Sequence, residues 1–216
     1  MKILITAGPT REPLDPVRYL TNRSSGKMGY ALAEAARDAG HEVTLISGPV
    51  NLPTPQGVET VQTETARQMF EAVRDRLSSH AAAIFSAAVA DYRPAAVAEQ
   101  KIKKTGDRLT LELEKTEDIL GSARSIFGYA GFLVGFAAET ENLAANAQEK
   151  CRRKGCDLLV ANDVSQPGIG FDSTENEVTL FRPDAPALRL PRQSKADLAR
   201  ELIALISRLA AAKIAP

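Results

Sequence analysis

The residues best suited to chemistry lie within the first thirty positions. An apolar run, Ile3 to Ala7, stops at Gly8, and a polar segment then leads to Met28, where a helical pattern begins. That segment carries these cationic, amide and small residues: Arg18, Asn22, Ser24, Ser25 and Gly26. Backbone N–H groups and the positive end of a helix dipole converge where a loop enters a helix. The segment therefore predicts an anion site, and Ser24 to Gly26 are candidates for cradling a phosphate.

Two well-known phosphate loops do not match this segment. A Walker A loop requires Gly-x4-Gly-Lys-Ser/Thr, whereas this chain reads Gly26-Lys27-Met28. The dinucleotide fingerprint Gly-x-Gly-x-x-Gly fails because residues 9–11, after Gly8, contain no glycine. A nicotinamide-dependent reductase is therefore disfavoured. An ordinary polar loop before a Ser-capped helix stays open as a structural alternative.

Three predicted strands end in small residues together with a polar or aromatic side chain. The segments are Ala87 to Tyr92, Gly135 to Thr140 and Ala161 to Asp163. The carboxyl ends of parallel strands share one edge of a sheet, where α/β proteins bind ligands. Small residues let a flat ring approach the backbone, and Asp91 offers a carboxylate to a ligand or a metal. Together the three strand ends predict one shared crevice.

Positive charge is concentrated locally. Lys101, Lys103 and Lys104 form a basic run in a predicted loop, and Lys150 and Lys154 share one face of a predicted helix. Such a loop can close over a nucleoside triphosphate and neutralise departing pyrophosphate. Alternatively, these lysines are solvated surface charges or guard an exposed strand edge.

The bulk composition is that of an ordinary soluble globular protein. Of the 216 residues 44% are hydrophobic and 25% charged, and 27 Lys plus Arg balance 27 Asp plus Glu, which gives no argument for nucleic-acid binding. No apolar run is long enough for a membrane span or a signal peptide, so we expect a cytoplasmic protein. Cys151 and Cys156, expected in one helix, have neither metal-ligand nor disulfide spacing, and His41 and His80 disfavour a His-based zinc site.

Apolar runs and amphipathic stretches alternate along the chain. The predicted strands are Lys2–Ala7, Glu42–Ile46, Val58–Val61, Ala82–Ser86, Leu133–Phe136, Leu158–Val160 and Val178–Phe181. The predicted helices are Lys27–Ala39, Glu64–Ser79, Leu143–Lys154 and Ser194–Ala212. Short, continuously apolar strands indicate a parallel sheet covered on both faces. We therefore expect one α/β domain over residues 1–216, Rossmann-like and doubly wound, with a mainly parallel sheet and helices on both faces.

Residues 92–115 break this rhythm. They contain no helix of ordinary length, and Leu109, Leu111 and Leu113 alternate with polar residues. Such alternation predicts a half-buried strand, so we expect an extra β flap or arm at about residues 92–115. Ser165 to Asn176 is expected to be an irregular loop, a kind of segment in which functional residues are frequent.

The ordered motifs carry a family resemblance that covers most of the chain. They are Ile5–Glu12, Asn22–Gly29, Ala87–Tyr92, Lys101–Asp107, Gly135–Thr140 and Ala161–Asp163. They resemble phosphopantothenoylcysteine synthetase of the bacterial type, which depends on cytidine triphosphate (CTP) and forms one half of a bifunctional coenzyme A biosynthesis flavoprotein. Glu117 stands where that family often has Pro, a departure that touches none of the implied roles.

The resemblance implies a ligase that joins 4′-phosphopantothenate to L-cysteine through an acyl cytidylate, with CTP converted to CMP and pyrophosphate. It implies that Lys101 stabilises departing pyrophosphate, that Asn22 holds the acyl cytidylate and assists the cysteine step, and that Arg18 orients the same intermediate. The expected nucleotide-binding residues are Gly8, Ser24, Ser25, Gly26, Ala87, Ala88, Asp91, Lys101, Phe136, Lys150 and Lys154. The expected substrate-binding residues are Arg18, Asn22, Ala88 and Asn162.

The resemblance also implies Mg²⁺, bound mainly through the nucleotide phosphates, with Asp91 as a candidate ligand and no certain protein ligand. It implies a homodimer, and no nucleic acid or membrane partner. No flavin is expected on this chain, because the decarboxylase half that usually lies upstream has no counterpart in it. That half is expected either fused upstream or as a separate protein. Two other classes stay open: an NAD(P)-dependent Rossmann-type reductase and a non-catalytic nucleotide-binding module.

Overall fold

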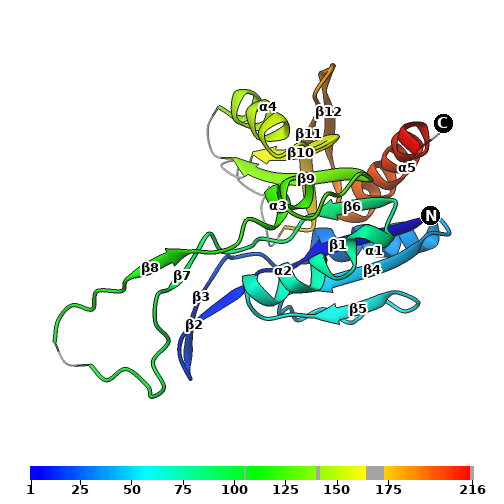
Figure 1. Cartoon of the computed structure of the whole chain (residues 1–216). Coiled ribbons are helices and arrows are strands. Elements are labelled where there is room, and N and C mark those ends of the chain that lie inside the picture. The colour runs from blue at the N-terminus through cyan, green and yellow to red at the C-terminus, as the bar shows by residue number, and fades with distance from the viewer. Residues whose placement is uncertain (105, 140–141, 164–172, 215–216) are drawn as a thin grey trace.

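The computed structural model describes residues 1–104, 106–139, 142–163 and 173–214, and its centre is an eight-stranded sheet (Figure 1). In spatial order the strands are β12 (Ala185–Ser194), β11 (Glu175–Arg182), β10 (Leu158–Asp163), β9 (Phe132–Glu139), β6 (Ala82–Phe85), β1 (Lys2–Ala7), β4 (Glu42–Ser47) and β5 (Glu59–Gln62). The strands from β10 to β5 run parallel, and β11 and β12 extend the sheet antiparallel.

Helices cover both faces of this sheet. The core on one face contains α1 (Lys27–Asp38) and α5 (Lys195–Ile214), and the core on the other contains α2 (Ala66–Arg74), α3 (Ile119–Ser125) and α4 (Leu143–Arg153). Alternation along β1 explains the two cores, because Ile3 and Ile5 pack with α1 while Leu4 packs with α2. The helix ends follow local signals as well: Thr65 and Gln68 form a capping box at α2, and Gly40, with φ of 79°, follows the end of α1.

The strand order reverses between β1 and β6. From β1 the chain proceeds outward through β4 to β5, and from β6 it proceeds in the other direction through β9 to β10. The loops after β1 and β6 therefore leave the sheet on opposite sides and open a crevice at their carboxyl ends, which is where α/β sheets bind ligands.

Two small antiparallel pairs lie outside the sheet. The hairpin is β2 (Arg11–Asp15) with β3 (Arg18–Thr21), and the arm is residues 92–115, with β7 (Tyr92–Pro94) and β8 (Leu113–Lys115) at its base. Figure 1 shows both extending away from the sheet in the same general direction. Glu12 fixes the hairpin to the core, because its buried carboxylate accepts a hydrogen bond from the N–H of Ala66, at the start of α2 (2.8 Å).

The sequence-based fold class is confirmed, and so are the seven predicted strands with small shifts of their ends. Some details were wrong, and some elements were not predicted. The predicted helix Glu64–Ser79 is α2 followed by a 3₁₀ turn, Leu77–Ser79, and Cys156 lies beyond the end of α4. The alternating leucines do not form a half-buried strand: β8 has three residues, and Leu109 and Leu113 are 60% and 43% exposed. The polar segment after Gly8 contains a hairpin, and β12 and α3 were not predicted.

Most of the predicted loop Ser165 to Asn176 lies outside the described residues. None of the helices in the described part of the chain has the length and apolar character that a membrane crossing requires.

Candidate functional site

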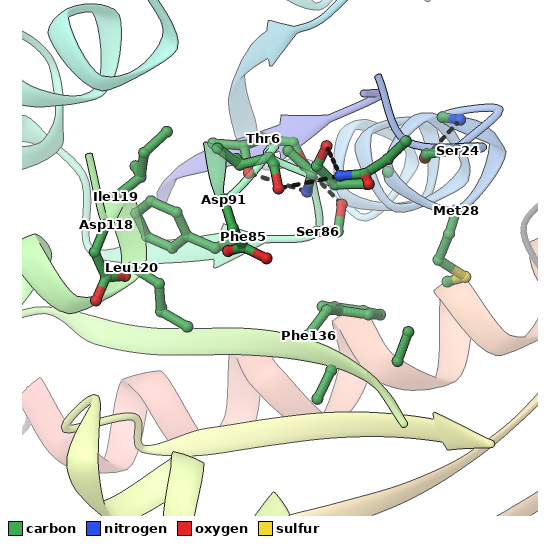
Figure 2. Close-up of a pocket in the computed structure, with 18 of the residues that line it drawn as sticks. Thr6, Ser24, Met28, Phe85, Ser86, Asp91, Asp118, Ile119, Leu120 and Phe136 are labelled. Atoms are coloured by element: carbon green, nitrogen blue, oxygen red, sulfur yellow. Dashed lines mark hydrogen bonds between the residues drawn. The ribbon is translucent and has the colours of Figure 1, made fainter. Parts of the chain in front are cut away.

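A cavity of about 780 Å³ lies at the carboxyl ends of β1, β6 and β9, beside the point where the strand order reverses. Thr6, Phe85 and Phe136 contribute to its wall from these three strands, and the first turn of α1 borders it. Figure 2 shows Phe85, Ile119 and Leu120 toward one end and Ser24 with Met28 toward the other. A cavity of this volume suits a ligand of nucleotide size.

The α1 end of the cavity is suited to an anion. Gly26 is the N-cap residue of α1, and no side chain caps the helix. The first N–H groups of a helix lack intrahelical partners and carry the positive end of its dipole. Ser24, Ser25, Gly26 and Lys27 line the cavity here. The predicted phosphate-cradling residues therefore lie at the cavity, and the alternative of a Ser-capped helix is wrong.

Gly8 has a packing role behind this loop and is not among the residues that line the cavity. A Cβ on Gly26 would lie 2.7 Å from Val50 Cγ1 and 3.3 Å from Gly8 Cα. A Cβ on Gly8 would lie 2.9 Å from the same Val50 atom, and both glycines have φ of 76°. Glycine at both positions thus permits the left-handed backbone and the close approach of the two loops. The predicted nucleotide contact of Gly8 stays a prediction.

The segment after β6 reaches the cavity and is held in place by the segment after β1. The Ala88 N–H donates to Gly8 O (2.9 Å), and the Ala90 N–H donates to Thr10 Oγ1 (3.0 Å). Ala87, Ala88 and Asp91 line the cavity, as their predicted role requires. Figure 2 shows the Asp91 carboxylate directed into the cavity.

Asn22 is oriented by this same segment. Its Nδ2 donates to Ala88 O (3.0 Å) and to Val89 O (3.1 Å), and the residue lines the cavity. Within the described residues no group donates to Asn22 Oδ1. The predicted donation to a developing oxyanion therefore requires Nδ2 to leave these carbonyls, whereas Oδ1 can accept from a ligand N–H without rearrangement.

Cations from α4 form another side of the cavity. Lys150, Arg153 and Lys154 line it, and Lys154 pairs with Asp118. Burial opposes ionisation of Asp118, but the Lys154 ammonium and the Gly121 N–H outweigh it and hold the pKa of that carboxyl below its ordinary value. Two predicted nucleotide contacts thus lie together, and Arg153 was missed although it is one helical turn from Lys150.

An apolar part of the cavity lining comes largely from the start of α3, a segment with no predicted role. Ile119 and Leu120 line the cavity together with Phe136, the predicted nucleotide contact on β9. Asp118 caps α3 by accepting from the Gly121 N–H (3.0 Å), and this N-cap signal before an Ile-Leu pair was readable in the sequence. Glu117 lines the cavity too and binds Arg93 through Oε2 (3.1 Å), so the family departure at this position borders the site after all.

Amide and ammonium groups also line the cavity. The predicted substrate contact Asn162 lines it, together with Asn176 and Lys195, which were missed. Asn176 and Lys195 are nearly buried, at 5% and 7% exposure. No sequence motif identifies Asn176 and Lys195 as site residues. They come from two late elements, β11 and the start of α5, and reach the cavity only through the fold.

Arg18 and Lys101 are not among the residues that line the cavity. Arg18 lies in the hairpin and Lys101 in the arm, where both are exposed. The Arg18 Nη2 donates to Ile102 O (2.9 Å), so Arg18 and Lys101, two of the three predicted catalytic residues, are neighbours. In a single chain they form a group of their own, apart from the other predicted site residues.

The residues present fit a magnesium ion that is held mainly by a ligand. Among the described residues no group of three or more His, Cys, Asp or Glu side chains could hold a metal. Asp91 does place a carboxylate at the cavity. Mg²⁺ is typically bound by one or two carboxylates together with substrate phosphates, so this donor set suits it.

Three comparisons with known proteins agree with one another. The family model described as DNA/pantothenate metabolism flavoprotein C-terminal domain matches residues 1–209. The coenzyme A biosynthesis bifunctional protein CoaBC of Vibrio vulnificus strain YJ016 is 51% identical over 209 residues, which are 96% of this chain and 52% of that protein. The chain thus spans about half the length of the curated relatives it matches.

Solved structures show the same fold. The C-terminal domain of CoaBC has a TM-score of 0.81 at 44% identity, with 96% of this chain and 94% of that domain covered. The DNA/pantothenate metabolism flavoprotein of Streptococcus pneumoniae has a TM-score of 0.81 at 24% identity, covering 97% and 99%, and supports the fold alone.

Proposed function

This chain belongs to the DNA/pantothenate metabolism flavoprotein C-terminal domain family, and from that premise we propose that it is a ligase of coenzyme A biosynthesis. It joins 4′-phosphopantothenate to L-cysteine, and CTP is converted to CMP and pyrophosphate. The observation that carries the proposal is the single cavity that combines the uncapped start of α1, Asn22, Asp91 and the α4 lysines. The name of the CoaBC relatives supports the pathway.

The first step activates a poor acylating agent. A carboxylate oxygen of 4′-phosphopantothenate attacks the α-phosphorus of CTP, and pyrophosphate leaves with the electron pair of the broken P–O bond. The start of α1 and the ammonium groups of Lys150 and Lys154 bind phosphate oxygens, and Lys101 neutralises charge on the departing pyrophosphate. Mg²⁺, when bound, supplies charge neutralisation at the phosphates.

The second step forms the amide. The cysteine amine attacks the acyl carbon of the cytidylate, CMP leaves, and the nitrogen loses a proton. Asn22 holds the intermediate, and its Oδ1 is placed to accept a hydrogen bond from the incoming amine. Arg18 orients the same intermediate. The apolar wall of Ile119, Leu120 and Phe136 receives the base of the nucleotide.

The proposal includes a homodimer in which the arm and hairpin of one chain serve the cavity of the other. The separation of Arg18 and Lys101 from their own cavity supports it, since a site that needs them is incomplete in one chain. Exposed apolar side chains on the arm support it too: Val97, Leu109, Leu111 and Leu113.

In the bifunctional relatives a further half accompanies this one, and we propose a phosphopantothenoylcysteine decarboxylase half, fused or separate, as its partner in the pathway.

Pyrophosphate release tests the function. Purified protein is given 4′-phosphopantothenate with CTP or with ATP, with and without cysteine. We expect pyrophosphate with CTP, and CMP and amide product only after cysteine is added. If no nucleotide yields pyrophosphate, the proposal is wrong.

Thermal shift with CTP, ATP, NADH and NADPH separates the other two classes, because a ligand that binds the folded state raises its apparent stability. Stabilisation by NADPH alone would favour a reductase. Stabilisation by CTP without any turnover would favour a nucleotide-binding module.

A further inference from the structure

Asp15 is, with Glu12, one of two buried carboxylates in a hairpin whose second strand, β3, is largely exposed. It ends β2, and its side chain has 0% exposure, whereas the Arg18 side chain beside it is 43% exposed. A buried charge is expensive unless it is paired and hydrogen-bonded. The Asp15 carboxylate must therefore accept hydrogen bonds from specific donors, and the identity of these donors indicates the role of the residue.

Five donors surround this carboxylate. Oδ1 accepts from the N–H of Val17 (3.0 Å) and of Arg18 (2.9 Å), which shapes the turn. Oδ2 accepts from Arg18 Nε (3.0 Å), from Arg18 Nη2, and from the Ile102 N–H (3.0 Å). The last bond crosses 87 residues of sequence to reach the arm.

Ile102 is held at both of its backbone polar groups. Its N–H binds Asp15, and its C=O accepts from Arg18 Nη2 (2.9 Å). Within the part of the chain that the structure describes, these two hydrogen bonds are the ones that attach segment 99–104. Lys101 directly precedes Ile102 in the sequence. One carboxylate thus orients the Arg18 guanidinium and fixes the backbone next to Lys101.

We propose that Asp15 is a positioning residue that joins Arg18 and Lys101 into one preorganised cationic unit. The inference rests on the proposed function, in which both cations act on the substrates. Without the carboxylate, Arg18 loses its orientation and segment 99–104 loses its attachment to the hairpin. The pairing of Ala98 N–H with Leu14 O (3.0 Å) remains, so the arm stays attached nearer its base.

Asp15→Asn is the informative variant because it keeps the size of the side chain. With its oxygen on the turn N–H groups of Val17 and Arg18, its amide nitrogen faces the Arg18 guanidinium and the Ile102 N–H, and a donor can accept from neither. The reverse orientation would place the nitrogen against the two turn N–H groups instead. Glu99→Gln is the matched control: it removes one carboxylate from the same arm segment, and Glu99 is exposed.

Hydrogen exchange of the Ile102 amide tests the contact itself. We expect protection in the wild type and in Glu99→Gln, and its loss in Asp15→Asn while the amides of the central sheet keep theirs. Unchanged Ile102 protection in Asp15→Asn would overturn the proposal. This measurement needs no turnover, so it stands even if the ligase function fails.

A double-mutant cycle with Lys101→Gln tests the consequence for catalysis. Asp15→Asn is expected to lower kcat for pyrophosphate release about a hundredfold, as misplaced catalytic groups do, with a small change in KM for CTP. In the Lys101→Gln background the same change should have little further effect on pyrophosphate release, because Lys101 is the member of the unit that acts on the departing pyrophosphate. Additive losses would indicate a general structural role and sink the inference. If Lys101→Gln alone leaves pyrophosphate release normal, the assignment of Lys101 in the proposed function is at fault instead.

Discussion

At the scale of single residues, the roles in this site depend on which atoms neighbours leave available. Asn22 donates through Nδ2 to two carbonyls, so Oδ1 is the atom it offers to a ligand. Lys154 is already paired with Asp118, whereas Lys150 lines the same cavity one helical turn away. Both lysines are proposed to bind phosphate oxygens, but only for Lys154 does the neighbouring Asp118 orient the ammonium group.

Lys101 and Asn22 are expected to act in different steps. Lys101→Gln should slow pyrophosphate release about a hundredfold, the usual effect of removing one transition-state contact, ~2.7–4 kcal/mol. Asn22→Asp should allow pyrophosphate release but block the amide product, because Asp cannot donate to Ala88 and Val89 and must turn away. Rapid-quench analysis of acyl cytidylate and amide distinguishes the two. Amide formation at the wild-type rate in Asn22→Asp would contradict the role of that residue.

Gly29→Ala tests the packing of α1 against the sheet. A Cβ at Gly29 would lie 2.5 Å from Ala7 Cβ and 2.7 Å from Ser86 Oγ, so α1 has to move. We expect a loss of about 1–3 kcal/mol in the free energy of unfolding, as overpacking usually costs, together with weaker CTP binding. Gly106→Ala is the control, because nothing lies within 4 Å of its Cβ position. Denaturant unfolding of both variants gives the comparison, and equal stabilities would refute the packing argument.

At the scale of elements, the hairpin and the arm behave differently from the sheet. The inner sheet strands β1, β4 and β6 are buried on both faces, while the arm contacts the hairpin through Asp15, Arg18 and Ile102 and leaves its leucines exposed. Alternation of Leu with polar residues predicts one apolar face, but periodicity does not say what covers that face. Here no described part of the same chain buries it.

The arm leucines are therefore expected to stabilise a dimer and not the fold. Leu111→Glu should shift the protein toward monomer in sedimentation velocity, since a charge replaces an apolar contact between chains. The free energy of unfolding of the monomer should change by no more than about 0.5 kcal/mol, as for other exposed substitutions. Leu188→Glu, on β12, is the control, because Leu188 is 53% exposed on another element. A wild-type protein that is monomeric at all concentrations would contradict this expectation.

At the scale of the whole molecule, the cavity and the core respond to different conditions. Charges in the cavity meet solvent and ligand, while the core contains thiol groups that titrate only at alkaline pH. Burial, with a smaller contribution from Cys151, raises the pKa of the Cys156 thiol to about 12. Burial also raises the pKa of the Tyr129 hydroxyl above its ordinary value.

A group whose pKa is higher in the folded state than in the unfolded state stabilises the fold fully at pH values below its unfolded-state pKa. This contribution is lost as the pH rises from the unfolded-state pKa through the folded-state pKa. For Cys156 the loss begins near pH 9, the ordinary value for a thiol, and continues toward pH 12. Wild-type unfolding free energy should therefore fall as pH rises above 9. Cys156→Ala should show a shallower fall, with part of the slope left to Tyr129. Chemical denaturation from pH 7 to 10.5 measures both slopes, and identical slopes would contradict the burial argument.

The sequence by itself determined the local elements and the chemical groups that they carry. Continuous apolar runs marked the buried strands, Ser24 to Gly26 marked the start of α1, and Asp91 and Phe136 marked two strand ends that do line the cavity. These signals are local, because strand burial, helix caps and turns depend on residues a few positions apart.

Only the tertiary structure decided which of these groups meet. Asn22 binds Ala88 across 66 residues, Lys154 binds Asp118 across 36, and Asp15 binds Ile102 across 87. Strand order and the packing of helices on the sheet set such distances, and no periodicity along the chain encodes them. For the same reason Asn176 and Lys195 joined the site without a local signal, while Arg18 and Lys101 came together outside the cavity.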